Sequence, residues 1–111
     1  MNKYNNKKTV IDNITFDSKK EALRYMDLKL LQRAKKIGNL KMQPVFVLLE
    51  EGINSYGQKY REMTYIADFS YMDCEKFEYI VEDVKGMKTE VYNIKKKLFM
   101  AKYPNYRFIE C

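Results

Sequence analysis

One stretch decides the fold of this chain: residues 79–86, which read YIVEDVKG. Apolar and aromatic residues followed by two acids, a valine and a lysine predict a strand that ends at Gly86. Because side chains alternate along a strand, Asp83 and Lys85 should point to one face and Glu82 to the other. A carboxylate and a lysine at the end of an apolar strand indicate a catalytic site, and an exposed strand end is the alternative. We expect Glu82 to lie at the surface or to contact a helix.

The preceding strand is predicted over residues 60–71, and Asp68 is the lone acid of its apolar stretch 65–69, YIADF. A tight turn at residues 73–76 separates it from the strand over 77–85. The two strands should therefore pair as an antiparallel hairpin.

Such a hairpin would bring Asp68 close to Asp83. Buried charges are costly unless they are paired or bind a metal. Two carboxylates on adjacent strands can share one cation, which offsets their repulsion. An ion pair of Asp68 with Lys85 or Arg61 is the structural alternative.

The rest of the chain predicts two helices and two further strands. The sequence Ser18-Lys19-Lys20-Glu21 matches the S-x-x-E capping box, and Gly38-Asn39 is a helix stop. The predicted elements are a loose arm over 1–13, a helix over 18–36, a strand over 45–50, a loop over 52–57, a helix over 89–102 and a strand over 106–109. The predicted apolar stripes of the helices are Leu23, Met26, Leu30, Ala34 and Ile37 in the first, and Val91, Ile94, Leu98 and Ala101 in the second. The order helix, three strands, helix, strand predicts a single α/β domain over 1–111.

The composition excludes several kinds of site. The chain has no histidine, and its two cysteines, Cys74 and Cys111, lie far apart. This excludes imidazole chemistry and argues against zinc, iron–sulfur and disulfide sites. A bound metal would be a hard ion such as Mg²⁺ or Mn²⁺. No apolar run approaches the ~20 residues of a membrane span, and residues 1–8 do not resemble a signal peptide, so a cytoplasmic location is expected.

Charge is unevenly placed along the chain. The formal net charge is +6, yet residues 42–84 carry nine acids and only three bases. An acidic centre can hold a metal ion, and basic flanks can track phosphates. Ordinary solvated lysine faces are the alternative.

With these residues in view, the chain resembles the PD-(D/E)xK nuclease superfamily. The motif is carried by Asp68, then Asp83-Val84-Lys85, with Glu21 on an earlier helix. Three stretches are similar to a family of small phage- and prophage-encoded proteins assigned to that superfamily: residues 16–22 (FDSKKEA), 65–69 (YIADF) and 81–86 (VEDVKG). Ala67 stands where the motif has proline. The resemblance implies a restriction-endonuclease-like core of a helix, three antiparallel strands, a helix and a strand.

The resemblance also implies a role for each matching residue. Glu21 would support the metal site, and capping its own helix is a compatible second role. Asp68 would be the central metal ligand, Asp83 the second, and the backbone carbonyl of Val84 a third. Lys85 would lie beside the attacking water and the scissile phosphate. A hard cation polarises a phosphoryl oxygen and lowers the pKa of bound water, and an ammonium group stabilises developing charge.

The second predicted helix adds candidate DNA contacts. Lys88, Tyr92 and Lys95 fall on one helical face with Lys96 beside them, and a solvated helix face is the alternative. We therefore expect metal-dependent hydrolysis of DNA. Branched or junction DNA is the candidate substrate, because so short a chain leaves little room for a sequence-reading domain. By analogy with phage junction resolvases, we expect a homodimer and a phage or host replication or recombination partner.

Two other classes of function compete with the nuclease. One is a noncatalytic module that grips DNA or blocks a host enzyme. The other is an assembly protein whose acids and lysines form ion pairs. The intact set of two acids and a lysine favours the enzyme.

Overall fold

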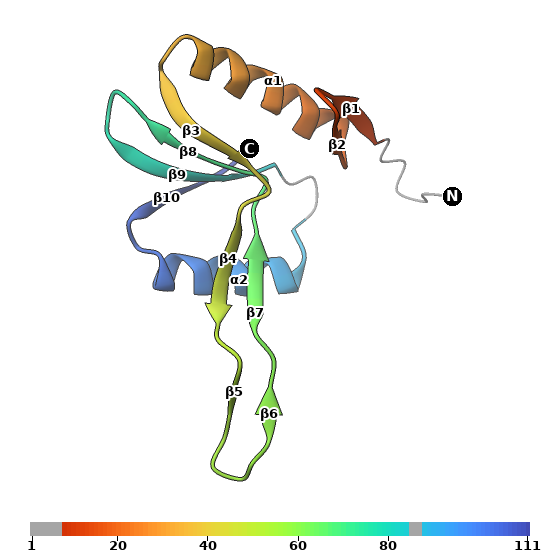
Figure 1. The fold of residues 1–111 in the computed structure, drawn as a ribbon, viewed down its shortest axis with the longest axis vertical. Helices are drawn as coiled ribbons and strands as arrows, with labels where there is room; N and C mark the ends of the chain where they lie inside the picture. The colour runs from red at the N-terminus through yellow and green to blue at the C-terminus, as the bar shows by residue number, and fades with distance from the viewer. Residues whose placement is uncertain (1–7, 85–87) are drawn as a thin grey trace.

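The computed structural model describes residues 8–84 and 88–111. Its centre is a four-stranded mixed sheet with the strand order β10-β9-β8-β3 (Figure 1). The strands are β3 (Ile37–Met42), β8 (Phe69–Asp73), β9 (Glu78–Asp83) and β10 (Tyr106–Glu110). Strand β8 is antiparallel to both β3 and β9, and β10 is parallel to β9. The expected hairpin of residues 60–85 is thus confirmed in its β8–β9 part.

Two helices lie on opposite sides of this sheet (Figure 1). The first, α1 (Lys19–Arg33), begins at Ser18, whose hydroxyl accepts a hydrogen bond from the Glu21 amide at 3.1 Å. This confirms the predicted helix start. The second, α2 (Glu90–Lys102), connects β9 to β10, as a parallel pair requires. The chain is a small α/β domain, and neither helix of the described ranges is long and apolar enough to cross a bilayer.

The first helix ends earlier than the sequence predicts. Lys35 adopts a left-handed φ of 61°, which stops α1 shortly after Arg33. The chain then enters β3 and pairs with β8, so the residues read as a helix stop, Gly38-Asn39, lie within a strand. The pairing shifts register between Gly38 and Lys41, where Asn39 has a φ of 56°. A bulge accommodates the two residues that disfavour regular strand structure.

A long two-stranded arm leaves the sheet (Figure 1). It consists of β4 (Val45–Leu49) paired with β7 (Met63–Ile66), and further out β5 (Gly52–Ile53) paired with β6 (Lys59–Tyr60). The strand predicted over 60–71 is therefore wrong as one element, because it divides into β6, β7 and β8.

The arm joins the sheet at a bend that two backbone hydrogen bonds define. Gln43 donates to the Asp68 carbonyl at 2.9 Å, and Ala67 donates to the Pro44 carbonyl at 3.1 Å. Proline has no amide hydrogen and cannot continue a regular ladder, so the two strands bend together at this point. Asp68 consequently lies where the arm meets the sheet.

The N-terminal region is also more ordered than expected. Residues 9–11 form β1 (Thr9–Ile11), which pairs with β2 (Ile14–Phe16) across a two-residue turn. Asp12 and Asn13 have φ values of 53° and 63°, as a primed hairpin turn requires. The expected loose arm over 1–13 is wrong for these residues.

Both helices bury a different face from the predicted one. In α1 the buried residues are Glu21, Ala22, Tyr25 and Leu28. The predicted stripe residues Leu23 and Leu30 are 51% and 60% exposed, respectively. In α2 the buried residues are Tyr92 and Phe99, whereas Val91, Ile94 and Leu98 are exposed. The aromatic rings bury more area than the aliphatic side chains and set the orientation of each helix.

The sheet separates two hydrophobic clusters. Ile80 packs beneath α1 with Phe69 and Tyr71. Val81, the next residue of β9, packs on the other side with Tyr92 and Phe99 of α2. The alternation of β9 therefore makes Glu82 face α1 and Asp83 face α2.

Candidate active site

Two aspartates meet at the end of the β8–β9 hairpin. Phe69 is paired with Glu82 across this hairpin, so Asp68 and Asp83 are opposite each other one position further along. Their carboxyl groups share a hydrogen bond. Asp83 is fully buried, and Asp68 Oδ2 accepts a hydrogen bond from the Val84 amide at 2.6 Å. The structure thus brings together the two acids that the sequence predicts to meet.

The environment of this pair disfavours two negative charges. Burial raises the pKa of Asp68 to about 8, and the hydrogen bond with Asp83 and the charges of Asp83 and Glu21 act in the same direction. The Val84 amide opposes this rise. An ion pair with a cation such as Arg61 would lower this pKa instead. The raised value therefore argues against a structural ion pair between Asp68 and Arg61.

Glu21 contributes the third carboxylate of the site. It lies in the first turn of α1 and is 5% exposed, on the face of the helix that packs against the sheet. Its charge raises the pKa of Asp68, which places an acidic side chain of α1 near the aspartate pair. Its amide donates to the Ser18 hydroxyl, and the capping role of the Glu21 carboxylate stays a prediction.

A tyrosine of the arm contacts Asp83. The Tyr65 hydroxyl donates a hydrogen bond to Asp83 Oδ2, and the Tyr65 side chain is 3% exposed. Burial, followed by this hydrogen bond, raises the pKa of Tyr65 well above its usual range. The Tyr65 hydroxyl is therefore a proton donor at neutral pH, and it fixes one oxygen of Asp83. No local sequence pattern identifies Tyr65 as a site residue, because a tyrosine in a strand is typically part of the core.

Basic side chains gather next to the pair, around Glu110. Tyr92 donates to Glu110 Oε2 at 2.6 Å, Lys96 donates to Oε1 at 2.7 Å, and Lys88 lies 3.4 Å from Oε1. The hydrogen bonds from Lys96 and Tyr92 lower the pKa of Glu110 to about 2. Glu110 is paired with Asp83 in the parallel β9–β10 ladder, so this cluster borders the aspartates.

Three of the four predicted nucleic-acid contacts therefore belong to one cluster, which we call the Glu110 cluster: Lys88, Tyr92, Lys96 and Glu110. The negative charges of Asp83 and Asp68 contribute to the raised pKa of Tyr92, after its burial and its bond to Glu110. The sequence analysis missed Glu110. Only the parallel pairing of β10 with β9 would have placed it beside Asp83.

The fourth predicted contact, Lys95, lines a pocket between β7 and α2. The pocket has a volume of about 270 Å³, and its walls are residues 64–66 together with Thr89, Val91, Tyr92 and Lys95. Tyr65 and Tyr92 join it to the acidic site, because their hydroxyl groups contact Asp83 and Glu110. We call this the β7–α2 pocket.

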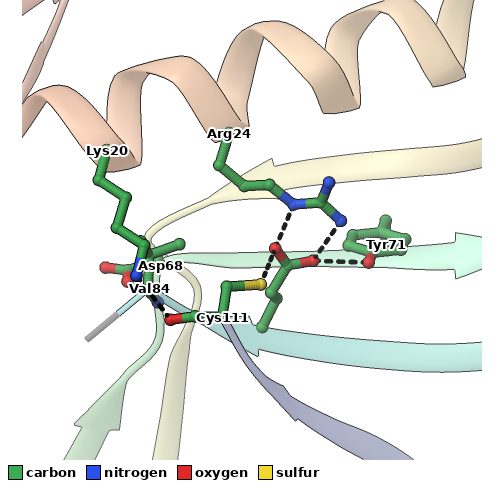
Figure 2. Close-up of polar contacts among 7 residues, drawn as sticks. Lys20, Arg24, Asp68, Tyr71, Val84 and Cys111 are labelled. Carbon is green, nitrogen blue, oxygen red and sulfur yellow. Dashed lines mark hydrogen bonds and ion pairs between the residues drawn. The ribbon is translucent and has the colours of Figure 1, made fainter. Parts of the chain in front are cut away.

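The neighbouring residue Glu82 has a structural environment. It is fully buried and forms a two-bonded ion pair with Arg24 of α1, and it accepts hydrogen bonds from Tyr71 at 2.6 Å and Cys111 at 2.9 Å (Figure 2). Three donors hold its pKa below the usual value despite burial. The predicted helix contact is confirmed, and the predicted surface position is wrong. Glu82 joins α1 to the sheet from the side opposite Asp83.

The remaining predicted site residues have mixed outcomes. Val84 contributes its amide to Asp68, and its predicted role as a carbonyl ligand stays a prediction. Lys85 lies outside the described residues. Within residues 8–84 and 88–111, no three acidic or cysteine side chains are already arranged as a metal-binding group. The side-chain groups of this site that could bind a metal ion are carboxylates and hydroxyls. Such oxygen ligands suit a hard cation and do not suit a soft one.

The whole chain matches one family. Residues 1–110 match the family described as "Protein of unknown function (DUF1064)", and the chain belongs to it. No curated protein and no solved structure matches the chain significantly.

Proposed function

We propose that this protein is a metal-dependent endonuclease that hydrolyses phosphodiester bonds in DNA. The observation that carries the proposal is the pair of half-buried Asp68 and fully buried Asp83, with the acidic Glu21 close enough to raise the pKa of Asp68. Two carboxyl groups that share a hydrogen bond need one proton between them. A divalent cation can replace that proton and offset the repulsion.

The arrangement of the elements supports the same proposal. A helix, three antiparallel strands, a second helix and a parallel strand follow one another as α1, β3, β8, β9, α2 and β10. We propose that this is a restriction-endonuclease-like core, with the arm and the β1–β2 hairpin as additions. In such a core the acids lie at the end of the central hairpin, which is where Asp68 and Asp83 lie.

The residues of this chain would divide the work as follows. Asp68 and Asp83 would hold Mg²⁺ or Mn²⁺, with Glu21 supporting the site and the Val84 carbonyl as a further oxygen. Bound there, the cation supplies Lewis-acid activation of the phosphate and a water of lowered pKa.

The tyrosines and lysines of the site would bind and orient the substrate. Tyr65 keeps one Asp83 oxygen oriented through its hydroxyl. Lys88 and Lys96 supply positive charge for the DNA backbone, and Glu110 restrains both ammonium groups. Lys85, two residues after Asp83, is the candidate to stabilise charge on the phosphate.

A cleavage assay tests the proposal. Labelled single-stranded, duplex, flap, fork and four-way-junction DNAs are incubated with Mg²⁺, Mn²⁺ or EDTA. We expect cutting that needs metal and that Asp83→Asn and Lys85→Ala abolish. Glu78→Gln is the matched control, because Glu78 lies on the same strand and its carboxylate forms an ion pair with the exposed Arg107 at 3.3 Å. Absence of cutting by the wild type with both metals on every substrate would refute the nuclease proposal.

One observation supports a second candidate, a noncatalytic DNA-binding or host-enzyme-blocking module. The acids of the described residues do not form a ready metal-binding group. This alternative predicts DNA binding that is equally tight in EDTA and in Mn²⁺, and that survives Asp83→Asn. Calorimetric titration with Mn²⁺ separates the two candidates, because only the nuclease requires wild-type binding that Asp83→Asn weakens.

We also propose that the protein acts as a homodimer in the cytoplasm of a bacterial cell. The apolar residues Leu23, Met26 and Leu30 are exposed along α1. Met26 and Leu30 line a hollow of about 230 Å³ together with Ile11 and Tyr25. Exposed apolar surface of this kind is typical of an interface. Two copies would provide two acidic sites, which suits paired cuts in branched DNA.

A further inference from the structure

The β7–α2 pocket has features that the hydrolysis of a phosphodiester bond does not itself require. Its volume is about 270 Å³. Pockets that bind small ligands usually have volumes from ~300 Å³ upward, so this pocket has room for about one small molecule. Duplex DNA cannot enter a pocket of this size, because the major groove alone is about 12 Å wide. A nucleobase that occupies it must therefore be unpaired.

One wall of the pocket is the open edge of a strand. In the described part of the chain, β7 pairs with β4 on one side only. The Ala67 amide donates to Pro44, so the backbone groups of Tyr65 also face β4. Those of Thr64 and Ile66 alternate with them and point away from β4, and both residues line the pocket. This edge offers main-chain donors and acceptors of the kind that bind the edge of a nucleobase.

The side chains that line the pocket combine apolar surface with a cation. Val91 is 61% exposed and Ile66 is 55% exposed, and both line the pocket. Their side chains can cover the apolar face of a base. Lys95 also lines the pocket and can contact a phosphate, and Thr64 and Thr89 add hydroxyl groups.

The position of the pocket relates it to the acidic site. Tyr65 lines the pocket and donates its hydroxyl hydrogen to Asp83, and Tyr92 lines the pocket and contacts Glu110. A DNA strand whose phosphate lies at Asp68 and Asp83 would therefore present a neighbouring nucleotide to this pocket. That nucleotide can enter only if it has no partner in a duplex.

We propose that the β7–α2 pocket binds one unpaired nucleotide next to the scissile phosphate, so that the substrate class is DNA with a single-stranded segment at the cutting point. This inference rests on the proposed nuclease function for its biological meaning, but the binding itself is measured without cleavage. Flaps, forks and single strands contain such nucleotides, and blunt duplexes do not.

The test compares three fluorescent DNA hairpins by anisotropy in EDTA. They share one stem; the first is blunt, the second carries an unpaired dT tail, and the third has extra base pairs with as many phosphates as the tail. The third controls for general electrostatic binding. We expect the wild type to bind the tailed hairpin about tenfold more tightly than the phosphate-matched one, which is the order of one base contact.

Two matched pairs of variants locate the effect. Val91→Phe fills the pocket, whereas Ile94→Phe makes a similar change at an exposed position of α2 outside the pocket wall. Lys95→Gln removes the pocket cation, whereas Lys97→Gln removes a lysine that does not line it. We expect Val91→Phe and Lys95→Gln to reduce the preference for the tail at least threefold and the two controls to retain it. Circular dichroism confirms that each variant is folded.

Equal affinity of the wild type for the tailed and phosphate-matched hairpins would overturn the inference. So would an equal loss of preference in Val91→Phe and Ile94→Phe. A protein that shows the expected preference but cuts no DNA with metal would refute the nuclease proposal and leave the pocket assignment standing. A protein that cuts DNA but lacks the preference would refute the pocket assignment alone.

Discussion

Glu82 and Asp83 are consecutive residues of β9, both fully buried, and they face opposite sides of the sheet. Glu82 meets Arg24 under α1, and Asp83 meets Tyr65 of the arm and Asp68. The first acid has a cation that balances its charge. The second has a carboxyl neighbour that opposes it. These two consecutive acids therefore have different roles: Glu82 stabilises the fold, and Asp83 is suited to bind a ligand.

The Glu82 side of this relationship predicts a loss of stability. Arg24→Ala would leave the fully buried Glu82 without its guanidinium partner. Removing one member of a buried ion pair costs about 3–5 kcal/mol, and we expect the lower end because Arg24 is 30% exposed. Urea unfolding in EDTA measures the change in free energy. The control is Arg33→Ala, in the exposed last turn of the same helix, which should cost less than about 0.5 kcal/mol.

The Asp83 side predicts the opposite effect. Asp83→Asn removes a negative charge from the pair and keeps an oxygen that can accept from Tyr65. We therefore expect the metal-free protein to become more stable by about 1 kcal/mol, since the unfavourable proximity of Asp68 and Asp83 is relieved. Urea unfolding in EDTA gives the value. A loss of more than about 1 kcal/mol would show that this residue serves the fold and not a site.

Asp68 predicts a pH dependence of stability. Its pKa is about 8 in the folded protein against a usual value of 3.8, so the folded state binds more protons than the unfolded state between these limits. Stability of the metal-free protein should therefore fall as the pH rises from 5 to 8. The chain has no histidine, so few other side chains titrate in this window. Thermal unfolding should show a higher Tm at the lower pH.

Two controls identify the group responsible for this pH dependence. Asp68→Asn should flatten the profile, because the titrating carboxyl is gone. Mn²⁺ should raise the Tm of the wild type most at pH 8, where both carboxylates are available to it. A Tm that rises steadily from pH 5 to pH 8 in EDTA would contradict the assignment.

Glu110 predicts a change in DNA affinity. It restrains Lys88 and Lys96, so Glu110→Gln frees two ammonium groups for phosphate contacts. We expect tighter binding of duplex DNA at low salt and a salt dependence steeper by about one to two released counterions. Glu90→Gln is the control, because it removes an acid from the first turn of α2 at an exposed position. Anisotropy titrations across a range of salt concentrations measure both slopes. Identical slopes for the two variants would show that the cluster does not face the DNA.

The exposed face of α1 predicts the oligomeric state. We expect the wild type to be a dimer in solution and Leu23→Lys with Leu30→Lys to be a monomer, since two buried lysines would oppose association. Asp27→Asn, an exposed change on the same helix, should leave the dimer intact. Light scattering after size-exclusion chromatography gives the mass of each. A monomeric wild type would refute the homodimer.

Much of the fold follows from local patterns. The S-x-x-E box placed the start of α1, and the tight turn at 73–76 placed the β8–β9 hairpin, because both depend on hydrogen bonds between near neighbours. The hairpin in turn predicted the meeting of Asp68 and Asp83. The end of α1 and the strand β3 were missed, since a helix stop and a bulge use the same residues, Gly38-Asn39.

The helix faces could not be predicted from aliphatic spacing. The stripe residues Leu23, Met26, Leu30, Val91, Ile94 and Leu98 are exposed. The helices instead bury Glu21, Tyr25, Tyr92 and Phe99. A helical wheel shows only on which side of a helix the aliphatic residues fall. The sheet selects the face whose rings and carboxylate fit its own side chains, which no local pattern contains.

The sequence by itself determined the chemistry available to this protein: no imidazole, few thiols, and many carboxylates, tyrosines and lysines. Only the tertiary structure decided which of these groups meet. The arm bends at Pro44, and Tyr65 contacts Asp83. Strand β10 pairs with β9, and Glu110 forms an ion pair with Lys96 of α2. These contacts join residues far apart in the chain, and their energies come from burial and pairing between distant strands, which local sequence does not encode.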